Sequence, residues 1–183
     1  VVHALLNESD CSLIQKHLSV SFQQSSAIHS AFQEDLFLEN VEISDPTELV
    51  YFLCTLLSKY VSLPDNFMTK VIERENIAST HLGNGIAVPH PSTVLLDDSK
   101  IVIAHLAKPI QWFDKKEVQW VFLLGMKKGD DPDQEALIRA LYTCISDIDF
   151  MRELSQRPSF SAFHTHLSSV LQIEESSADS IFQ

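Results

Sequence analysis

Basic residues are scarce in this sequence of 183 residues, since Lys and Arg number 13 against 25 Asp and Glu, for a formal net charge of −12. Nucleic-acid affinity depends chiefly on Lys and Arg contacts to phosphates, so this balance argues against DNA or RNA binding by this chain. It favours basic proteins or small molecules as partners. The three cysteines are widely spaced and form no CxxC pair. We therefore expect no disulfide framework, no metal site and a reducing compartment.

Long apolar runs and phosphate-binding loops are also missing. No apolar run reaches the roughly 18 residues of a membrane span, and the N-terminus lacks the basic and apolar segments of a signal peptide. Only four glycines occur, and none belongs to a Walker loop or a dinucleotide fingerprint. The sequence therefore predicts a cytoplasmic protein with no membrane span and no cofactor.

The apolar content, 45% of the residues, is sufficient for one hydrophobic core in a domain of this length. The sequence begins at Val1 rather than Met, and we interpret it as a piece of a longer polypeptide. Residues 1–35 are rich in Ser, Gln and His, with one short helix expected near residues 13–18, and are interpreted as a linker or the tail of an upstream domain. The domain itself is expected at residues 36–175, followed by a C-terminal tail at residues 176–183.

Helix start signals and β-branched segments alternate along the expected domain. Asp45 and Pro46 are suited to the N-cap and first position of a helix, and apolar residues at three- and four-residue steps follow. A second start signal at residues 62–65 predicts a helix that ends near Glu75. The same signals predict a loop and short strand at residues 80–89, strands at 101–107 and 118–124, and helices after Asp131, at 150–154 and at 160–171. This order indicates an α/β or α+β fold.

Most of the eight histidines have a structural interpretation. His3, His17 and His29 lie in the polar N-terminal segment, and His81 could simply face water. His105 is expected to be packed within a strand, and His164 and His166, two apart on a helix, cannot chelate one metal in the i, i+4 manner.

His90 differs because it follows a short apolar strand and stands between Pro89 and Pro91, which restrict the backbone on both sides. A neutral imidazole can attack a phosphoryl group and carry it as a phosphohistidine. Stabilising the phosphoryl oxygens needs positive charge or N–H donors. Arg74, Thr80 and the backbone of the glycine loop at residues 83–85 are candidates. The residues alone favour neither a functional nor a purely structural His90.

Two motifs favour a functional His90. The sequence ERENIAST at residues 73–80, followed by GNGIAVPH at 83–90, resembles the signature of the phosphotransferase-system (PTS) EIIA domains of type 2, the fructose/mannitol type. Further matches are KPIxW at 108–112 and FMREL at 150–154, so the resemblance covers residues 36 to about 171. It implies a mixed sheet of about five strands flanked by helices on both sides. It also implies that His90 accepts a phosphoryl group, which Arg74 helps to hold.

Two departures from this pattern bear on function. Mannitol-type EIIA domains have a second histidine at the start of the helix after the central strand, and counting along the motifs places Gln134 there. A glutamine can donate a hydrogen bond to a phosphoryl oxygen but cannot carry the charge of an imidazolium. Pro91 stands where a small residue is common and has no N–H to donate. Both departures favour a domain that senses phosphorylation over one that passes the group on rapidly.

The resemblance supports two functions of different classes. The first is a regulatory EIIA-like domain at the C-terminal end of a transcriptional regulator or antiterminator with PTS regulation domains, controlled by phosphorylation of His90. The alternative is a transport EIIA component that takes a phosphoryl group from HPr and hands it to a sugar-specific EIIB. Implied partners are HPr, EIIB and upstream domains of the same polypeptide. Whether the domain is an enzyme or only an acceptor stays open, as does a third possibility, a degenerate domain that only docks partners.

Overall fold

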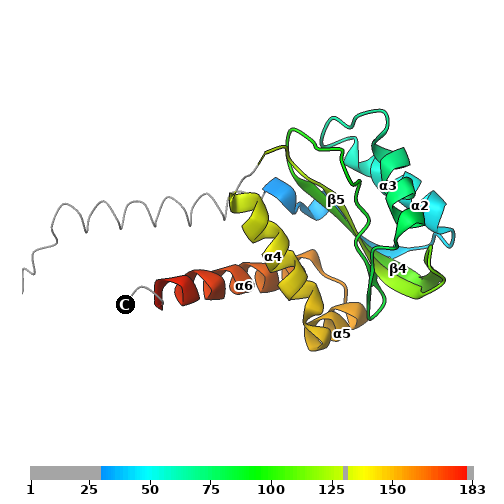
Figure 1. Cartoon of the computed structure of the whole chain (residues 1–183). Coiled ribbons are helices and arrows are strands. Elements are labelled where there is room, and N and C mark those ends of the chain that lie inside the picture. The colour runs from blue at the N-terminus through cyan, green and yellow to red at the C-terminus, as the bar shows by residue number, and fades with distance from the viewer. Residues whose placement is uncertain (1–29, 130–131, 181–183) are drawn as a thin grey trace, which may run out of the picture.

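A mixed sheet of five strands organises the computed structural model, which describes residues 30–129 and 132–180 (Figure 1). The strand order is β1-β4-β5-β3-β2. Strands β4 and β5 pair antiparallel, as do β2 and β3, whereas β1 pairs parallel with β4 and β3 pairs parallel with β5. The strands are β1 (Phe37–Val41), β2 (His81–Gly83), β3 (Ile86–Ala87), β4 (Lys100–Gln111) and β5 (Glu117–Gly125).

Helices cover both faces of this sheet, so the predicted α/β fold is confirmed. Helices α2 and α3 lie on one face, and α4, α5 and α6 lie on the other (Figure 1). The bounds are α2 (Pro46–Leu57), α3 (Phe67–Ile77), α4 (Pro132–Ser146), α5 (Ile148–Gln156) and α6 (Phe160–Ser180), with a 3-10 turn η1 (Glu34–Leu36) before β1. The helix expected near residues 13–18, the N-terminal histidines, Cys11 and Asp131 lie outside the described residues. None of the described helices combines the length and apolarity needed to cross a bilayer.

The start of α2 is confirmed, whereas the start of α3 was placed too early. The Asp45 carboxylate accepts a hydrogen bond from the Glu48 N–H at 2.8 Å, and Pro46 is the first helical residue. Helix α3 begins only at Phe67, because the chain first makes a turn in which the Phe67 N–H donates to the Pro64 carbonyl at 2.9 Å. The start signal at residues 62–65 therefore marks a turn ahead of the helix.

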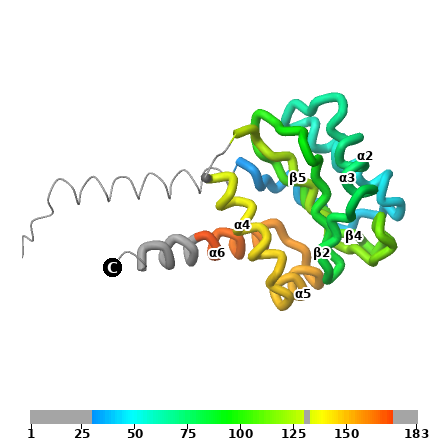
Figure 2. Tube along the Cα trace, in the orientation of Figure 1, coloured from blue at the N-terminus to red at the C-terminus, as the bar shows by residue number. Residues whose placement is uncertain are grey.

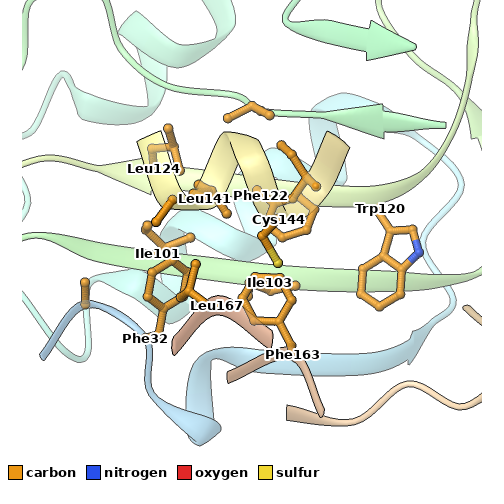
Figure 3. Close-up of a cluster of buried hydrophobic side chains, with 14 of the residues drawn as sticks. Phe32, Ile101, Ile103, Trp120, Phe122, Leu124, Leu141, Cys144, Phe163 and Leu167 are labelled. Carbon is orange, nitrogen blue, oxygen red and sulfur yellow. The ribbon is translucent and has the colours of Figure 1, made fainter. Parts of the chain in front are cut away.

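Residues 100–106 of β4 are buried on both faces and separate two hydrophobic clusters. Ile101 and Ile103 pack under α4 and α6, and Val102 and Ala104 pack under α2 and α3. This alternation follows from the two-residue period of a strand. Phe163 of α6 lies among aromatic and aliphatic side chains of the first cluster (Figure 3). Ala31 and Phe32, which precede the domain start expected at residue 36, also pack there.

His105 is packed within β4, as expected, and is an unusual member of the core. It is 5% exposed, its ring centroid lies 4.5 Å from that of Trp120, and neither ring nitrogen has a hydrogen-bond partner. Desolvation lowers the pKa of this imidazole from the ordinary 6.5, and the charge of Glu39 offsets this only in part. The neutral form is therefore the one compatible with the fold.

Stability should fall on acidification because of His105. Below pH 6.5 the unfolded chain binds a proton at this imidazole while the folded chain does not, so the free energy of unfolding decreases until the pH passes the lowered folded pKa. Replacing His105 with Leu, of similar size, should flatten the stability profile between about pH 7 and pH 5. Urea titrations of both proteins across this range measure the effect, and two parallel profiles would contradict it.

Candidate active site around His90

The His90 loop is fastened to the carboxyl end of β5. The Leu124 N–H of β5 donates to the Pro89 carbonyl at 3.0 Å, and β3, just before this loop, pairs parallel with β5. Figure 2 shows the segment that includes β2 and β3 running along the sheet beside β5. His90 thus stands just past the end of a strand, as expected, and its side chain is half-buried.

One contact decides which nitrogen of His90 can react. The ring Nδ1 lies 2.8 Å from the Val88 carbonyl oxygen. A carbonyl oxygen only accepts hydrogen bonds, so Nδ1 must carry the ring proton and donate it there. In the neutral imidazole this leaves the lone pair on Nε2. The geometry therefore presents Nε2 as a nucleophile.

The glycine loop that precedes His90 has an unusual backbone. Gly83, Asn84 and Gly85 have φ angles of 95°, 51° and 73°, all in the left-handed region where glycine is favoured. The Gly85 carbonyl accepts hydrogen bonds from the N–H groups of Gln119 at 2.8 Å and Trp120 at 3.0 Å. This tight reversal joins β2 to β3 and sets β3, and hence His90, against β5.

Arg74 and Thr80, the two predicted partners of His90, differ in what they contact. The half-buried Arg74, in the last turn of α3, donates from its guanidinium to the Ala78 carbonyl. Thr80 is buried, and its carbonyl accepts a hydrogen bond from the Val88 N–H at 3.2 Å, which places it directly beside the His90 loop. Its hydroxyl donates to the Glu75 carboxylate. Sequence reasoning gave Glu75 no role, although it stands beside Arg74 in the same motif.

Gln134 lies in the first turn of α4 and uses both ends of its amide on the protein. Its oxygen accepts from the Ser99 hydroxyl at 3.1 Å, and its nitrogen donates to the Gly129 carbonyl at 3.3 Å. Ser99 immediately precedes β4, whose first residue pairs with Gly125 at the end of β5. Gln134 and the His90 loop therefore lie at the same end of the central strands, and the hydrogen bonds of the Gln134 amide go to Ser99 and Gly129.

The two cysteines that the structure describes are poorly suited to nucleophilic chemistry. Cys54 and Cys144 are buried free thiols, and burial raises the pKa of each to about 12, so both remain protonated. His81 has a structural surrounding: it is half-buried, with Nδ1 3.6 Å from Asp114 Oδ2, rather than fully exposed to water. In residues 30–129 and 132–180, no three His, Cys, Asp or Glu side chains gather in a way that could hold a metal ion.

The family of the chain follows from its sequence as a whole. Residues 30–170 match the family described as "Phosphoenolpyruvate-dependent sugar phosphotransferase system, EIIA 2". The chain belongs to this EIIA 2 family. The resemblance drawn from the motifs at 73–80 and 83–90 is thereby confirmed.

Relatives of this EIIA 2 domain include both regulators and transport proteins. The transcriptional regulator ManR of Bacillus subtilis is 28% identical over 66% of the chain, and the probable licABCH operon regulator of the same organism is 23% identical over 87%. Multiphosphoryl transfer protein 1 of Escherichia coli is 35% identical over 73% of the chain. The chain spans only about a fifth of these relatives, namely 18%, 24% and 18% of their lengths.

Solved structures support the fold. The complex of enzyme IIAMTL and phosphorylated enzyme IIBMTL from Escherichia coli matches with a TM-score of 0.63 at 15% identity, over 75% of this chain and 96% of the other. The nitrogen regulatory protein IIA-Ntr of Neisseria meningitidis matches with a TM-score of 0.62 at 21% identity, over 72% and 91%. At these identities the likeness concerns the fold alone.

Proposed function

We propose that this EIIA 2 domain is the regulatory module of a PTS-controlled transcriptional regulator, switched by phosphorylation of His90 on Nε2. The hydrogen bond from Nδ1 to the Val88 carbonyl carries the proposal, because it leaves Nε2 as the nucleophile. The Nε2 lone pair forms the new P–N bond while the P–N bond of a phosphohistidine donor breaks, and its electron pair returns to the donor ring. Added negative charge on a domain that is already acidic is the physical signal.

The remaining site residues have assigned tasks in this proposal. Arg74 supplies positive charge to the phosphoryl oxygens after exchanging its contact with the Ala78 carbonyl. Thr80 acts mainly through its backbone, because its hydroxyl proton is directed to Glu75. Gln134 donates a neutral hydrogen bond in place of a second imidazole. A site with one imidazole suits storage of a phosphoryl group better than its rapid onward transfer.

Partner proteins are expected to dock over the His90 loop, at the carboxyl end of β5. Ile77, Leu82 and Leu95 are exposed by 83%, 49% and 44%, and they belong to α3, β2 and the loop after His90, the segments that build the site. We propose that these side chains make apolar contacts when a partner protein docks there. We propose a PTS protein such as HPr or an EIIB as the phosphoryl donor, and upstream domains of the same cytoplasmic polypeptide as the responding partner. The part of the chain before Ala31 would connect them to the domain, since Ala31 and Phe32 already pack in its core.

A transport EIIA component is the second candidate. The multiphosphoryl transfer protein and the 2-O-alpha-mannosyl-D-glycerate-specific EIIABC component of Escherichia coli are 35% and 30% identical to this chain. These matches support phosphoryl transfer through His90 equally well. The two candidates differ in what accepts the phosphoryl group from the domain.

Phosphoryl labelling tests the proposal and separates the two candidates. The domain, mixed with labelled phosphoenolpyruvate, enzyme I and HPr, and with an EIIB where one is required, should acquire one acid-labile phosphoryl group. A regulatory module should then keep its label in the presence of EIIB and sugar, or lose it slowly. Rapid delivery of the label to sugar would favour the transport component, and absence of labelling with every donor would refute both.

The Gln134→His variant should transfer the phosphoryl group faster. An imidazolium at this position would add positive charge where the glutamine offers a neutral donor. Rapid-quench measurement of labelling should give a rate several-fold above wild type, and Gln134→Ala serves as the control for loss of the amide. Identical rates for Gln134→His and wild type would show that this side chain does not reach the phosphoryl group.

A further inference from the structure

Glu75 is a buried carboxylate that the proposed reaction does not use. It is 2% exposed, at the end of α3. Three neutral donors hold it: the Thr80 N–H at 3.0 Å, the Thr80 hydroxyl, and the Trp112 indole N–H at 3.0 Å. Burying an ionised carboxylate is costly unless its oxygens are well bonded. The three donors satisfy this carboxylate, so it can act as a fixed anchor for the groups that donate to it.

A short series of hydrogen bonds connects this carboxylate to the reactive imidazole. Glu75 accepts from the Thr80 backbone N–H, and the Thr80 carbonyl accepts from the Val88 N–H at 3.2 Å. The Val88 carbonyl in turn accepts from His90 Nδ1 at 2.8 Å. Two hydrogen bonds, both made by the Thr80 backbone, therefore connect Glu75 to Val88, whose carbonyl fixes the His90 tautomer.

The Glu75 carboxylate is itself held in place by Trp112. Trp112 follows directly after β4 and is 1% exposed, so its indole is a rigid anchor in the second hydrophobic cluster. Glu75 thereby joins three segments that are separate in sequence, namely the end of α3, the residue before β2 and the turn after β4. Arg74 precedes Glu75 on α3, so the hydrogen bonds of Glu75 also restrict the position of the Arg74 backbone.

We propose that Glu75 is a positioning residue that, through Thr80, holds the Val88 carbonyl against His90 Nδ1 and so keeps the Nε2 lone pair free. Its effect on the ring tautomer needs no phosphorylation to be observed. Its effect on the rate of labelling rests on the function proposed above. Loss of the carboxylate should let the Thr80 segment move, weaken the bond to Nδ1 and mix the two neutral tautomers.

The ¹⁵N chemical shifts of the His90 ring, measured by NMR at a pH where the ring is neutral, test the structural half of this proposal. Wild type should show predominantly protonated Nδ1, and Glu75→Ala should show a mixture of tautomers. Glu75→Gln should behave like wild type, because its amide oxygen can accept from the Thr80 and Trp112 N–H groups while its NH₂ donates to a rotated Thr80 hydroxyl. Glu73→Ala, on the same helix but half-exposed and paired with Lys70, is the matched control and should change nothing.

Labelling rates test the functional half. Glu75→Ala should be phosphorylated on the order of tenfold more slowly or worse, Glu75→Gln within about threefold of wild type, and Glu73→Ala at the wild-type rate, since small displacements of reacting groups are costly. If Glu75→Ala does not fold, Thr80→Val and Trp112→Phe, which each remove one donor, should shift the tautomer ratio in the same direction. A wild-type tautomer ratio in folded Glu75→Ala, or in both Thr80→Val and Trp112→Phe where Glu75→Ala does not fold, would overturn the proposal. If Glu75→Ala changes the tautomer ratio but the wild-type protein takes no label, only the proposed function would be refuted.

Discussion

Replacing His90 with Ala is expected to abolish phosphoryl incorporation entirely. The variant removes Nε2, the nitrogen of the His90 ring that does not face the Val88 carbonyl. His105 cannot take over, because both of its nitrogens are buried in the core. The measurement is transfer of label from phosphoenolpyruvate through enzyme I and HPr, with acid lability of the product as the mark of a phosphohistidine.

The control for this experiment is His81→Ala. His81 lies nine positions earlier in β2 and is half-buried, but its ring faces Asp114. This variant should retain most of the labelling, which would exclude a general effect of losing an imidazole near the glycine loop. Label that persists on His90→Ala would mean that another residue accepts the phosphoryl group. A circular dichroism spectrum matching that of wild type would establish that the His90 variant is folded.

Local signals made parts of the fold predictable. The Asp45-Pro46 start of α2 is encoded within four residues, and its capping bond spans three. Strands β4 and β5 each contain a largely apolar run that is buried on both faces, residues 100–106 and 120–125, so composition alone marks these runs. Strands β1 and β2 were not predicted. They are short, lie at the two edges of the sheet and include exposed residues, so no alternation of apolar side chains distinguishes them from loops.

The candidate site was predictable only in part, for a similar reason. Pro89 and Pro91 identify His90 as a constrained residue, the need for positive charge or N–H donors makes Arg74 and Thr80 candidates, and the family motif supports His90 and Arg74. The contacts that give His90 its tautomer depend instead on the path of the backbone between Thr80 and Val88. The bond between Glu75 and Trp112 joins residues 37 positions apart. Sequence spacing gives no indication of such a contact, which forms only when α3 and the turn after β4 meet.

Phe163→Ala is expected to lower the free energy of unfolding more than any other single substitution proposed for this domain. Phe163 is fully buried in α6, with ring centroids 5.7 Å from Phe32, 6.3 Å from Phe37 and 5.9 Å from Phe122 (Figure 3). Truncation removes these contacts and leaves a cavity that the sheet cannot fill. Substitutions of this kind cost about 3–5 kcal/mol, a large share of the stability of a typical domain. Urea denaturation should show the loss directly, with the melting temperature lower by on the order of 10 °C.

Phe52→Ala is the matched control, because the same atoms are removed from a side chain that is 40% exposed on α2. Its cost should stay within about 1 kcal/mol. Equal losses in the two variants would mean that α6 contributes little to the fold and that the helix is docked only weakly. A loss confined to Phe163→Ala would show that the packing of α6 on the sheet contributes to the stability of the fold. Since β5 fastens the His90 loop through Leu124, that variant should also lose phosphorylation at temperatures where Phe52→Ala retains it.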